Sequence, residues 1–468
     1  MRVLLVLALV QAVGYLTLRV LESQQSRLRT LELWSLSFGA GFGILSLGMF
    51  YLAYWRIALS QTNILIGTAV LLASLIILWT VVASRRQKTL PLVWRSLSAL
   101  EWISSTVVGL CVVIVFADAL SQPLLAFDAR AIWAFKAKVL CFEQGIYNEA
   151  FLDAERLHAK TRYPQLVPLA ETFVASVSGA FHEPAIKLLF PCFYVSLILL
   201  VGVELSRAFD RRYALLCTSL FASLPVFTIY ANGGAASGYA DLPLAFYVTA
   251  LSTRLFRWLQ DGSSSNLHLA LLFTSLTVFT KTEGLALVFV VLSTTALAAW
   301  LAYRRSVRSL WPLPVTVLGG LICLAPWFLY QARLPVVDED IVKLLTVQNL
   351  VGGLTRLPYI ILSLVRELFL KLHLWSLLGL SAAVLVLRSP RTVVQSRFSV
   401  LLWTPLLNAV VLTAIFLVIP WKLEELFPVA LTRLMMHVAP LLFLWLCFET
   451  GNSGLLGRHL SADDPSRQ

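Results

Sequence analysis

Residues 103–120 read ISSTVVGLCVVIVFADAL, an apolar run that is broken only near its end. A hydrocarbon core of about 30 Å is crossed by about 20 helical residues, so this run predicts a membrane span. Similar runs recur along the whole chain. We place about thirteen spans, at residues 3–21, 34–54, 63–83, 103–120, 184–206, 214–231, 240–258, 267–280, 284–302, 312–330, 372–388, 398–419 and 434–449.

The composition indicates the same class of protein. Of the 468 residues, 59% are hydrophobic and only 13% are charged, and the mean hydropathy is +0.81. A soluble protein of this length would have too little polar surface to cover itself. Because a backbone cannot cross lipid with unpaired amides, and no run alternates as a barrel strand does, the spans must be helices. We predict an all-α integral membrane fold with a long extracytoplasmic loop after the fourth span.

The distribution of charge predicts the topology. If the spans alternate, the basic segments all fall on one side, which we assign to the cytoplasm. These segments are 27–29, 85–88, 207–212, 254–257, 304–308 and 388–397. The net charge of +12 then reflects topology and contact with anionic lipid, and it does not indicate nucleic-acid binding. The extracytoplasmic side of this inner-membrane protein receives 121–183, 232–238, 281–283, 331–357 and 420–433.

The chain divides into three parts on these criteria. Residues 1–99 form an accessory three-span segment that lacks unusual polar residues on the outer side. Residues 100–450 hold the outer segments and form the predicted catalytic module, with 121–183 as its long outer loop. Residues 451–468 are a short polar tail, predicted to be cytoplasmic and disordered.

The most unusual polar residues open the long loop, where the chain reads FDARAIWAFKAK from Phe127. Asp128 is followed by Arg130, Lys136 and Lys138, set among aromatic residues at the foot of a span. An acid beside several cations suits an enzyme that binds a lipid phosphate and deprotonates a nucleophile at the membrane surface. A structural alternative is that Asp128 pairs with Arg130 or Lys136 and that the lysines extend to lipid headgroups.

Other acids and bases are weaker candidates. Asp118 lies near the end of a span and is the second choice for the reactive acid, because a charge at this depth is costly unless it is paired or functional. Asp241 precedes an apolar run, where an acid also favours the positive end of a helix dipole. Lys281 and Glu283 lie between two spans and could neutralise each other as a buried pair.

Metal and disulfide sites receive little support from the sequence. The six cysteines have neither zinc-site spacing nor the arrangement of a disulfide framework. A divalent metal is conceivable in the long loop, although no regular spacing defines its ligands. The candidates are Asp153, Glu155, His158, His182 and Glu183.

Four motifs in order resemble those of a known enzyme superfamily. They read DARAIWAFKAK at 128–138, RYPQLVPL at 162–169, GYADLPLA at 238–245 and KTEGLA at 281–286. The region from about 100 to 450 resembles bacterial members of the GT-C glycosyltransferases, which include relatives of the dolichyl-phosphate-mannose protein mannosyltransferases and the aminoarabinose transferases. No single motif is specific, and the resemblance depends on their order and their common side.

This resemblance implies inverting transfer of a sugar from a polyprenyl-phosphate donor to a hydroxyl of an extracytoplasmic glycan, lipid or protein acceptor. Asp128 matches the acid that acts as general base in such enzymes, and no cofactor is required. The implied cations for the donor phosphate are Arg130, Lys136, Lys138 and Arg433. The residues implied to face the cavity or support the acceptor are Asp241, Tyr163, Lys281 and Glu283.

Two other functions remain open at this point. A secondary transporter would also have about a dozen spans, but it should show ionisable residues near the bilayer midplane and a repeat between its halves, and neither is clear. A non-catalytic membrane component of envelope glycan assembly would explain the hydropathy. It would not explain why an acid and several cations gather on one side, so the transferase is preferred.

Overall fold

A computed structural model describes residues 2–22, 28, 30–83, 96–153, 155, 160–304, 306–336, 341–390 and 396–453. All regular elements in this part of the chain are helices. Those of the first half are α1 (Arg2–Leu21), α2 (Thr30–Tyr54), α3 (Gln61–Ala83), α4 (Ala99–Ser121), the π-helical η1 (Ala129–Ala134), α5 (Phe135–Glu143), α6 (Glu149–Leu152), α7 (Leu166–Ser178), α8 (Glu183–Lys187), α9 (Leu189–Ala208), α10 (Arg211–Ala222) and α11 (Pro225–Thr228).

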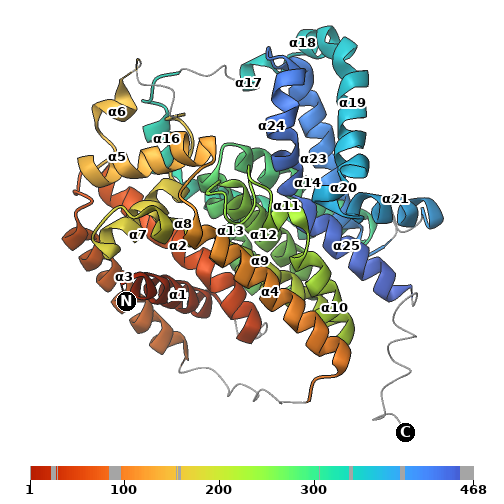
Figure 1. The fold of residues 1–468 in the computed structure, drawn as a ribbon, viewed down its shortest axis with the longest axis horizontal. Coiled ribbons are helices and arrows are strands. Elements are labelled where there is room, and N and C mark those ends of the chain that lie inside the picture. The colour runs from red at the N-terminus through yellow and green to blue at the C-terminus, as the bar shows by residue number, and fades with distance from the viewer. Residues whose placement is uncertain are drawn as a thin grey trace.

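The helices of the second half complete one bundle, which Figure 1 shows with α9 and α12 near its middle and α19, α23 and α24 along one side. They are α12 (Asp241–Asp261), α13 (Ser264–Thr280), α14 (Glu283–Leu301), η3 (Val307–Leu310), α15 (Pro312–Ile322), α16 (Ala325–Gln331), α17 (Ile341–Leu344), α18 (Val347–Gly352), η4 (Gly353–Arg356), α19 (Leu357–Val365), the π-helical η5 (Arg366–Leu370), α20 (Leu372–Trp375), α21 (Leu378–Arg388), α23 (Ser399–Val418), α24 (Leu423–Met436) and α25 (Ala439–Asn452).

Seven of the described helices are long and apolar enough to cross a membrane, and nine spans result if each of two bent helix pairs counts as one. The helical, multi-pass class is therefore as predicted, but the count of about thirteen spans is not confirmed. Among the remaining runs, α10 has 12 residues, α13 has 17 and α21 has 11. The 21-residue α12 carries two arginines inside it. Hydropathy detects apolar stretches, but it does not detect where a helix ends.

The two bent pairs each have a proline near the start of the second helix. Helices α15 and α16 meet at 55°, and Pro326 is the second residue of α16. Helices α24 and α25 meet at 49°, and Pro440 is the second residue of α25. Proline has no backbone N–H and cannot continue a preceding helix without strain, which accounts for both bends. The second bend places His437 inside the bundle.

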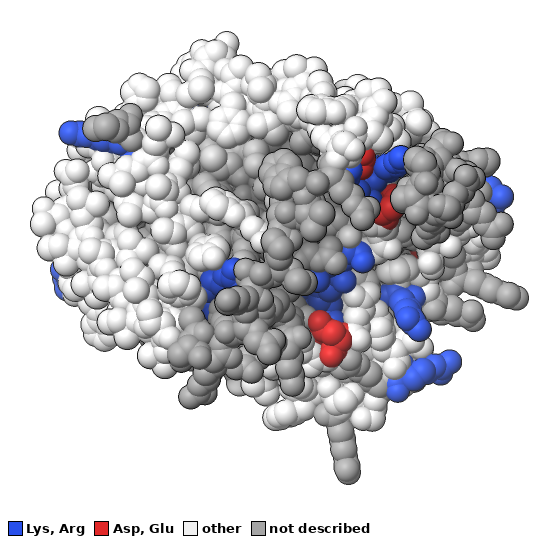
Figure 2. Space-filling model, turned by 90° about the horizontal axis from the view of Figure 1, so that it is seen from below, with Lys and Arg blue, Asp and Glu red and all other residues white. Residues whose placement is uncertain are grey.

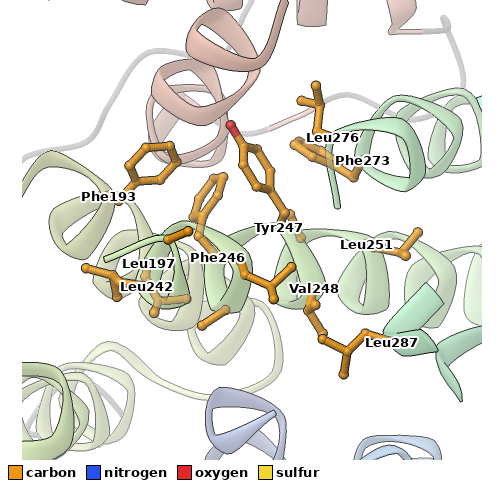
Figure 3. Close-up of a cluster of buried hydrophobic side chains, with 14 of the residues drawn as sticks. Phe193, Leu197, Leu242, Phe246, Tyr247, Val248, Leu251, Phe273, Leu276 and Leu287 are labelled. Carbon is orange, nitrogen blue, oxygen red and sulfur yellow. The ribbon is translucent and has the colours of Figure 1, made fainter. Parts of the chain in front are cut away.

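The core is built around α12, whose side chains are buried along most of its length (Figure 3). The rings of Phe246 and Phe193 meet with their centroids 5.6 Å apart. The Tyr247 hydroxyl donates to the Gly39 carbonyl of α2 at 2.8 Å. A Cβ at Gly39 would lie 2.2 Å from the Phe246 ring, so a glycine is needed for α2 to approach this closely.

Hydrogen bonds join segments that were predicted to share a side of the membrane. On the predicted outer side, the Gln331 side chain donates to the Arg162 carbonyl at 2.8 Å. On the predicted inner side, Arg211 pairs with Glu101, and Ser265 donates to a carbonyl at the end of α1. Several predicted basic positions, namely 27, 29, 85–88, 305 and 391–395, lie outside the described residues.

A buried group of charges links three helices on the predicted inner side. Arg254 of α12 lies between Glu32 of α2 and Glu204 of α9. Arg207 adds a second cation to Glu32, and Arg257 adds a second cation to Glu204. These five residues are named the Arg254 cluster. The sequence placed Arg254 in a basic loop, whereas the structure places it inside α12 with 1% of its side chain exposed.

Exposed tryptophans lie near helix ends, as expected for side chains at a lipid–water interface. Trp102 and Trp300 lie near the ends of α4 and α14 that are predicted to face inward, and Trp55 follows α2 on the predicted outer side. Figure 2 shows one face of the molecule, on which most of the described surface carries no charge and the basic side chains gather in a few places. Both features agree with a protein surrounded by lipid.

Helices α1, α2 and α3 of the segment 1–99 are packed into the same bundle as the other described helices. Helix α2 contacts α7, α9, α12 and α13, and α1 contacts α2 and α7. The accessory role predicted for this segment is a statement about function, and it remains a prediction. The tail from 454 onward lies outside the described residues.

Candidate functional site

Asp241 begins α12 and lies at the centre of a group of ionic side chains. Its side chain is fully buried. Its Oδ1 accepts from the Lys281 ammonium at 2.9 Å and contacts His437 Nε2 at 2.9 Å. Its Oδ2 accepts from Arg433 through Nε at 3.0 Å and Nη2 at 2.9 Å. A carboxylate has about four lone-pair sites, so Asp241 is saturated by the protein and has no site left for a substrate proton.

Arg433 connects this group to Asp128. Its Nη1 donates to Asp128 Oδ2 at 2.7 Å, and its guanidinium lies 4.4 Å from the centroid of the Tyr239 ring. The Tyr239 hydroxyl in turn accepts the backbone N–H of Asp128 at 3.2 Å. The Asp128 side chain is 23% exposed, and its Oδ1 has no hydrogen-bond partner among the described residues. Asp128 therefore keeps one oxygen available for an incoming group.

Lys281 and Glu283 form the ion pair that the sequence suggested, at 2.8 Å. Because the Lys281 ammonium also contacts Asp241, this pair belongs to the larger network rather than being isolated. Three acids here face two fixed cations and one histidine. The Asp241 cluster is defined as Asp128, Asp241, Lys281, Glu283, Arg433 and His437.

The linker between α4 and η1 holds Asp128 in place. The buried Lys187 ammonium donates to the carbonyls of Gln122 at 2.7 Å and Pro123 at 3.2 Å. Carbonyls at a helix C-terminus lack partners within the helix, and a cation there satisfies them. The Glu183 carboxylate accepts the N–H of Leu124 at 3.2 Å. Helix α8 thus fixes the path of the chain just before Asp128.

Two backbone features complete the setting of Asp128. The six residues that follow it form the π-helical η1, a rare geometry that is often found at functional sites. Gly238, the residue before Tyr239, has a φ of 81°. A Cβ at this position would lie 3.0 Å from the Cβ of Ala129, so only glycine allows the loop to approach η1 this closely.

Lys136 has its contacts outside the Asp241 cluster. It is fully buried, its ammonium donates to the Tyr163 carbonyl at 3.2 Å, and it lies 6.0 Å from the Trp133 ring centroid. Burial lowers the pKa of the Lys136 amine well below its ordinary value. The half-buried Tyr163 ring lies 5.9 Å from the Trp133 ring. The structure therefore does not bring the predicted phosphate ligand Lys136, or the predicted sugar contact Tyr163, into the cluster.

Three other residues considered from the sequence are exposed at the surface. Lys138 lies 3.7 Å from Glu183 and over the Phe181 ring. The Arg130 guanidinium has no ion-pair partner among the described residues. Asp118 is exposed at the end of α4 and is not part of the Asp241 cluster. The structural alternative, in which Asp128 pairs with Arg130 or Lys136, is not what the structure shows, because Asp128 pairs with Arg433.

The possible metal ligands of the long loop that belong to the described residues do not form a metal site. Within the described residues, no three His, Cys, Asp or Glu side chains are arranged to hold a metal ion. His158 was one of the candidates and lies outside these residues. The Glu183 carboxylate accepts a hydrogen bond from the backbone N–H of Leu124.

Sequence reasoning missed two members of this site. His437 fell inside an apolar run that was assigned to a span, and only the bend between α24 and α25 reveals why a polar residue is there. Tyr239 lay within a quoted motif, but an aromatic residue at a helix entrance gave no sign that it would support a guanidinium. A histidine three residues before the proline at the start of α25 was the one usable signal.

Comparison with protein-family models, curated proteins and solved structures gives no match for this chain. The resemblance to GT-C enzymes therefore rests on the four motifs alone. Three of these motifs supply members of the Asp241 cluster, and the 162–169 motif supplies none.

Proposed function

We propose that this protein is a membrane glycosyltransferase that moves a sugar from a polyprenyl-phosphate donor to a hydroxyl of an envelope glycan, lipid or protein. One observation carries the proposal. Asp128, Asp241, Lys281 and Arg433 are far apart in the sequence and meet in one ionic cluster, in which Asp128 is partly exposed and has an open carboxylate oxygen. A membrane scaffold has no need of such an acid.

In the proposed reaction, Asp128 Oδ1 takes the proton of the acceptor hydroxyl. The acceptor oxygen forms a bond to the anomeric carbon from the side opposite the phosphate. The bond from that carbon to the phosphate oxygen breaks, and its electron pair stays with the phosphate. The products are an inverted glycoside and a polyprenyl phosphate. A positioned general base of this kind contributes about 10²- to 10⁴-fold in rate.

Arg433 is the cation best situated to stabilise the leaving phosphate. Negative charge increases on the phosphate oxygens as the bond breaks, and a guanidinium donates to two of them at once. Asp241 holds the guanidinium through two of its nitrogen atoms, and Tyr239 supports its face. Asp241 is therefore a positioning residue for Arg433 in this proposal, rather than a ligand of the acceptor.

Apolar grooves beside α14 support a lipid-linked donor. One groove of about 430 Å³ includes Phe289 and Val317, and another of about 320 Å³ includes Leu297 and Leu406. Their linings are almost entirely apolar. Glu283 of the Asp241 cluster begins the same helix, and Phe289 follows it by about 9 Å along the axis. A polyprenyl chain whose phosphate lies at the cluster would meet these surfaces within the bilayer.

The side of the membrane is also part of the proposal. The Asp241 cluster is assigned to the extracytoplasmic face of the inner membrane, because the basic segments of the chain collect toward the other side. Sugars linked to polyprenyl phosphate serve as donors where nucleotide sugars are absent, and this fits an outer-face site.

Asp128→Asn tests the proposal directly. The change keeps the size of the side chain and removes most of its proton affinity, so transfer from a polyprenyl-phosphate sugar should fall by about 100-fold or more. Transfer would be measured with purified protein in lipid, together with its thermal unfolding midpoint. The midpoint should change little, because Arg433 keeps its ion pair with Asp241.

Asp118→Asn is the matched control, since Asp118 is an exposed aspartate on the preceding helix. It should transfer at the wild-type rate. Near-normal transfer by Asp128→Asn would remove the proposed base. If the wild-type protein transfers no sugar but moves a solute across the membrane of a vesicle, the transporter is favoured instead.

A further inference from the structure

A second ionic group lies beside the Asp241 cluster. The Glu367 carboxylate is 2% exposed and accepts from the Lys371 ammonium at 2.7 Å, from the Trp375 indole at 3.0 Å and from the Thr432 hydroxyl at 2.6 Å. Lys371 also donates to Thr432 at 3.2 Å. These four residues are named the Glu367 cluster. They come from η5, α20, their junction and α24, and none of the four residues had been selected from the sequence.

The two clusters are physically continuous. Thr432 of the Glu367 cluster directly precedes Arg433 in α24. The Tyr230 side chain lies near Thr432 and interacts electrostatically with both Arg433 and Glu367. A Cβ at Gly233 would lie 3.4 Å from the Tyr230 ring and 3.5 Å from Arg433 Cγ, so these two side chains flank the same glycine. Lys371 therefore hydrogen-bonds the residue that directly precedes Arg433, whose guanidinium the proposed mechanism uses.

Both cations have unused hydrogen-bond donors. An ammonium has three N–H groups, and Lys371 uses two of them, on Glu367 and Thr432. A guanidinium has five, and Arg433 uses three, on Asp241 and Asp128. The Lys371 side chain is 35% exposed. Three donors from two neighbouring cations suit a phosphate, whose oxygens accept several charge-assisted hydrogen bonds.

Glu367 explains how a lysine can be held ready at this position. A free lysine loses rotamer entropy when a ligand orders it. Here the buried carboxylate already holds the ammonium, and η5, which carries Glu367, is π-helical like η1 beside Asp128. Lys136 contrasts with this arrangement. It is fully buried and its pKa is lowered, so it offers no exposed cation.

We infer that Lys371 is the second phosphate-binding cation, acting together with Arg433 on the polyprenyl-linked phosphate. This inference rests on the proposed function. It replaces Lys136 in that role and assigns Glu367 as the residue that positions Lys371. The ligand class is a phosphate monoester or diester attached to an isoprenoid chain.

The test uses farnesyl phosphate as the ligand and farnesol as its uncharged counterpart, titrated into the purified full-length protein. Lys371→Gln should weaken farnesyl phosphate binding by about tenfold, the value of one charge-assisted hydrogen bond. Farnesol binding should not change. Lys422→Gln is the matched control, because Lys422 is an exposed lysine paired with Glu425 at the start of α24. Its affinity for farnesyl phosphate should equal that of the wild type.

Further variants separate ligand binding from folding. Glu367→Gln keeps the cation but removes the carboxylate that holds it in place, so farnesyl phosphate should bind more weakly than to the wild type and more tightly than to Lys371→Gln. A purely structural pair would instead make Glu367→Gln and Lys371→Gln weaken binding alike. The double variant Glu367→Gln with Lys371→Gln leaves no unpaired buried charge, and it should lose the same tenfold as Lys371→Gln alone.

The outcomes distinguish the inference from its premise. Unchanged farnesyl phosphate affinity in both Lys371→Gln and the double variant would overturn the role of Lys371 and leave the proposed function standing. A wild-type protein that binds farnesol and farnesyl phosphate equally would overturn both, since no phosphate site would then exist.

Discussion

The Asp241 and Arg254 clusters are attached to the same helix, α12, about 20 Å apart along its axis. In the Arg254 cluster, two acids are each shared between two arginines, and neither acid is more than 1% exposed. In the Asp241 cluster, the central acid is equally buried, but Asp128 at the edge is 23% exposed. The first arrangement joins three packed helices, and the second leaves polar atoms available to a ligand.

The origin of the residues explains this difference. The Arg254 cluster takes its members from α2, α9 and α12, which pack side by side along their length. The Asp241 cluster takes its members from a loop, two helix starts and a bent helix pair. Charges between packed helices become enclosed, whereas charges at helix ends can remain open on one side. Mutations in the Arg254 cluster should therefore reduce mainly stability, and mutations in the Asp241 cluster should reduce mainly sugar transfer.

Glu204→Gln should give the largest effect, and it should be on stability. The change leaves Arg254 and Arg207 sharing Glu32 and leaves Arg257 without a carboxylate. Breaking a buried ionic group in this way costs about 3–5 kcal/mol, as measured by unfolding of the purified protein. Sugar transfer per folded molecule should not change.

Arg254→Met provides the comparison for this prediction. It leaves two separate pairs, Glu32 with Arg207 and Glu204 with Arg257, and each acid remains neutralised. It should therefore destabilise the protein less than Glu204→Gln. Equal losses from the two variants would show that charge balance is not what holds these three helices together.

Asp241→Asn should have the opposite effect, with a large loss of sugar transfer and a small loss of stability. It leaves Lys281 and Arg433 facing Asp128 and Glu283, two charges against two, so the loss of stability should be smaller than for Glu204→Gln. Arg433 would be less well fixed, and a displacement of about 1 Å at a reacting centre can cost about 100-fold in rate. Transfer assays should show a tenfold to 100-fold loss. Full activity in this variant would mean that Asp241 does not position Arg433.

The smallest perturbation tests which side each cluster faces. Glu143→Cys introduces a thiol on the exposed end of α5, and Ser264→Cys introduces one at the exposed start of α13. Neither should alter stability or transfer. A membrane-impermeant thiol reagent applied to intact cells should label the first above the background of the six native cysteines and should not label the second. The reverse pattern would invert the proposed topology.

Much of the candidate site was accessible from the sequence because its residues break apolar patterns. Asp128, Asp241 and Lys281 each stand out beside a long apolar run, and the pairing of Lys281 with Glu283 follows from their closeness in the chain. The partner of Asp128 was not accessible in this way. Arg130 and Lys136 are close in sequence, yet the ion pair is made by Arg433, 305 residues away.

The count of about thirteen spans is not confirmed, for a related reason. Hydropathy marks 214–231 as one run, whereas α10 ends at Ala222 and a short α11 follows. The run at 372–388 likewise contains α20 and an 11-residue α21. Local composition predicts whether a segment is apolar. It does not predict how far a helix continues once its neighbours are packed around it.

The sequence by itself determined the membrane class, the helical fold and the separation of basic from mixed segments, because each depends on composition and on periodicity within single segments. Only the tertiary structure decided that Arg433 binds Asp128, that Lys136 is buried away from that pair, and that Lys371 hydrogen-bonds Thr432, the residue before Arg433. These pairings depend on which helix ends meet. That is decided by packing between distant segments, and hydropathy carries no information about it.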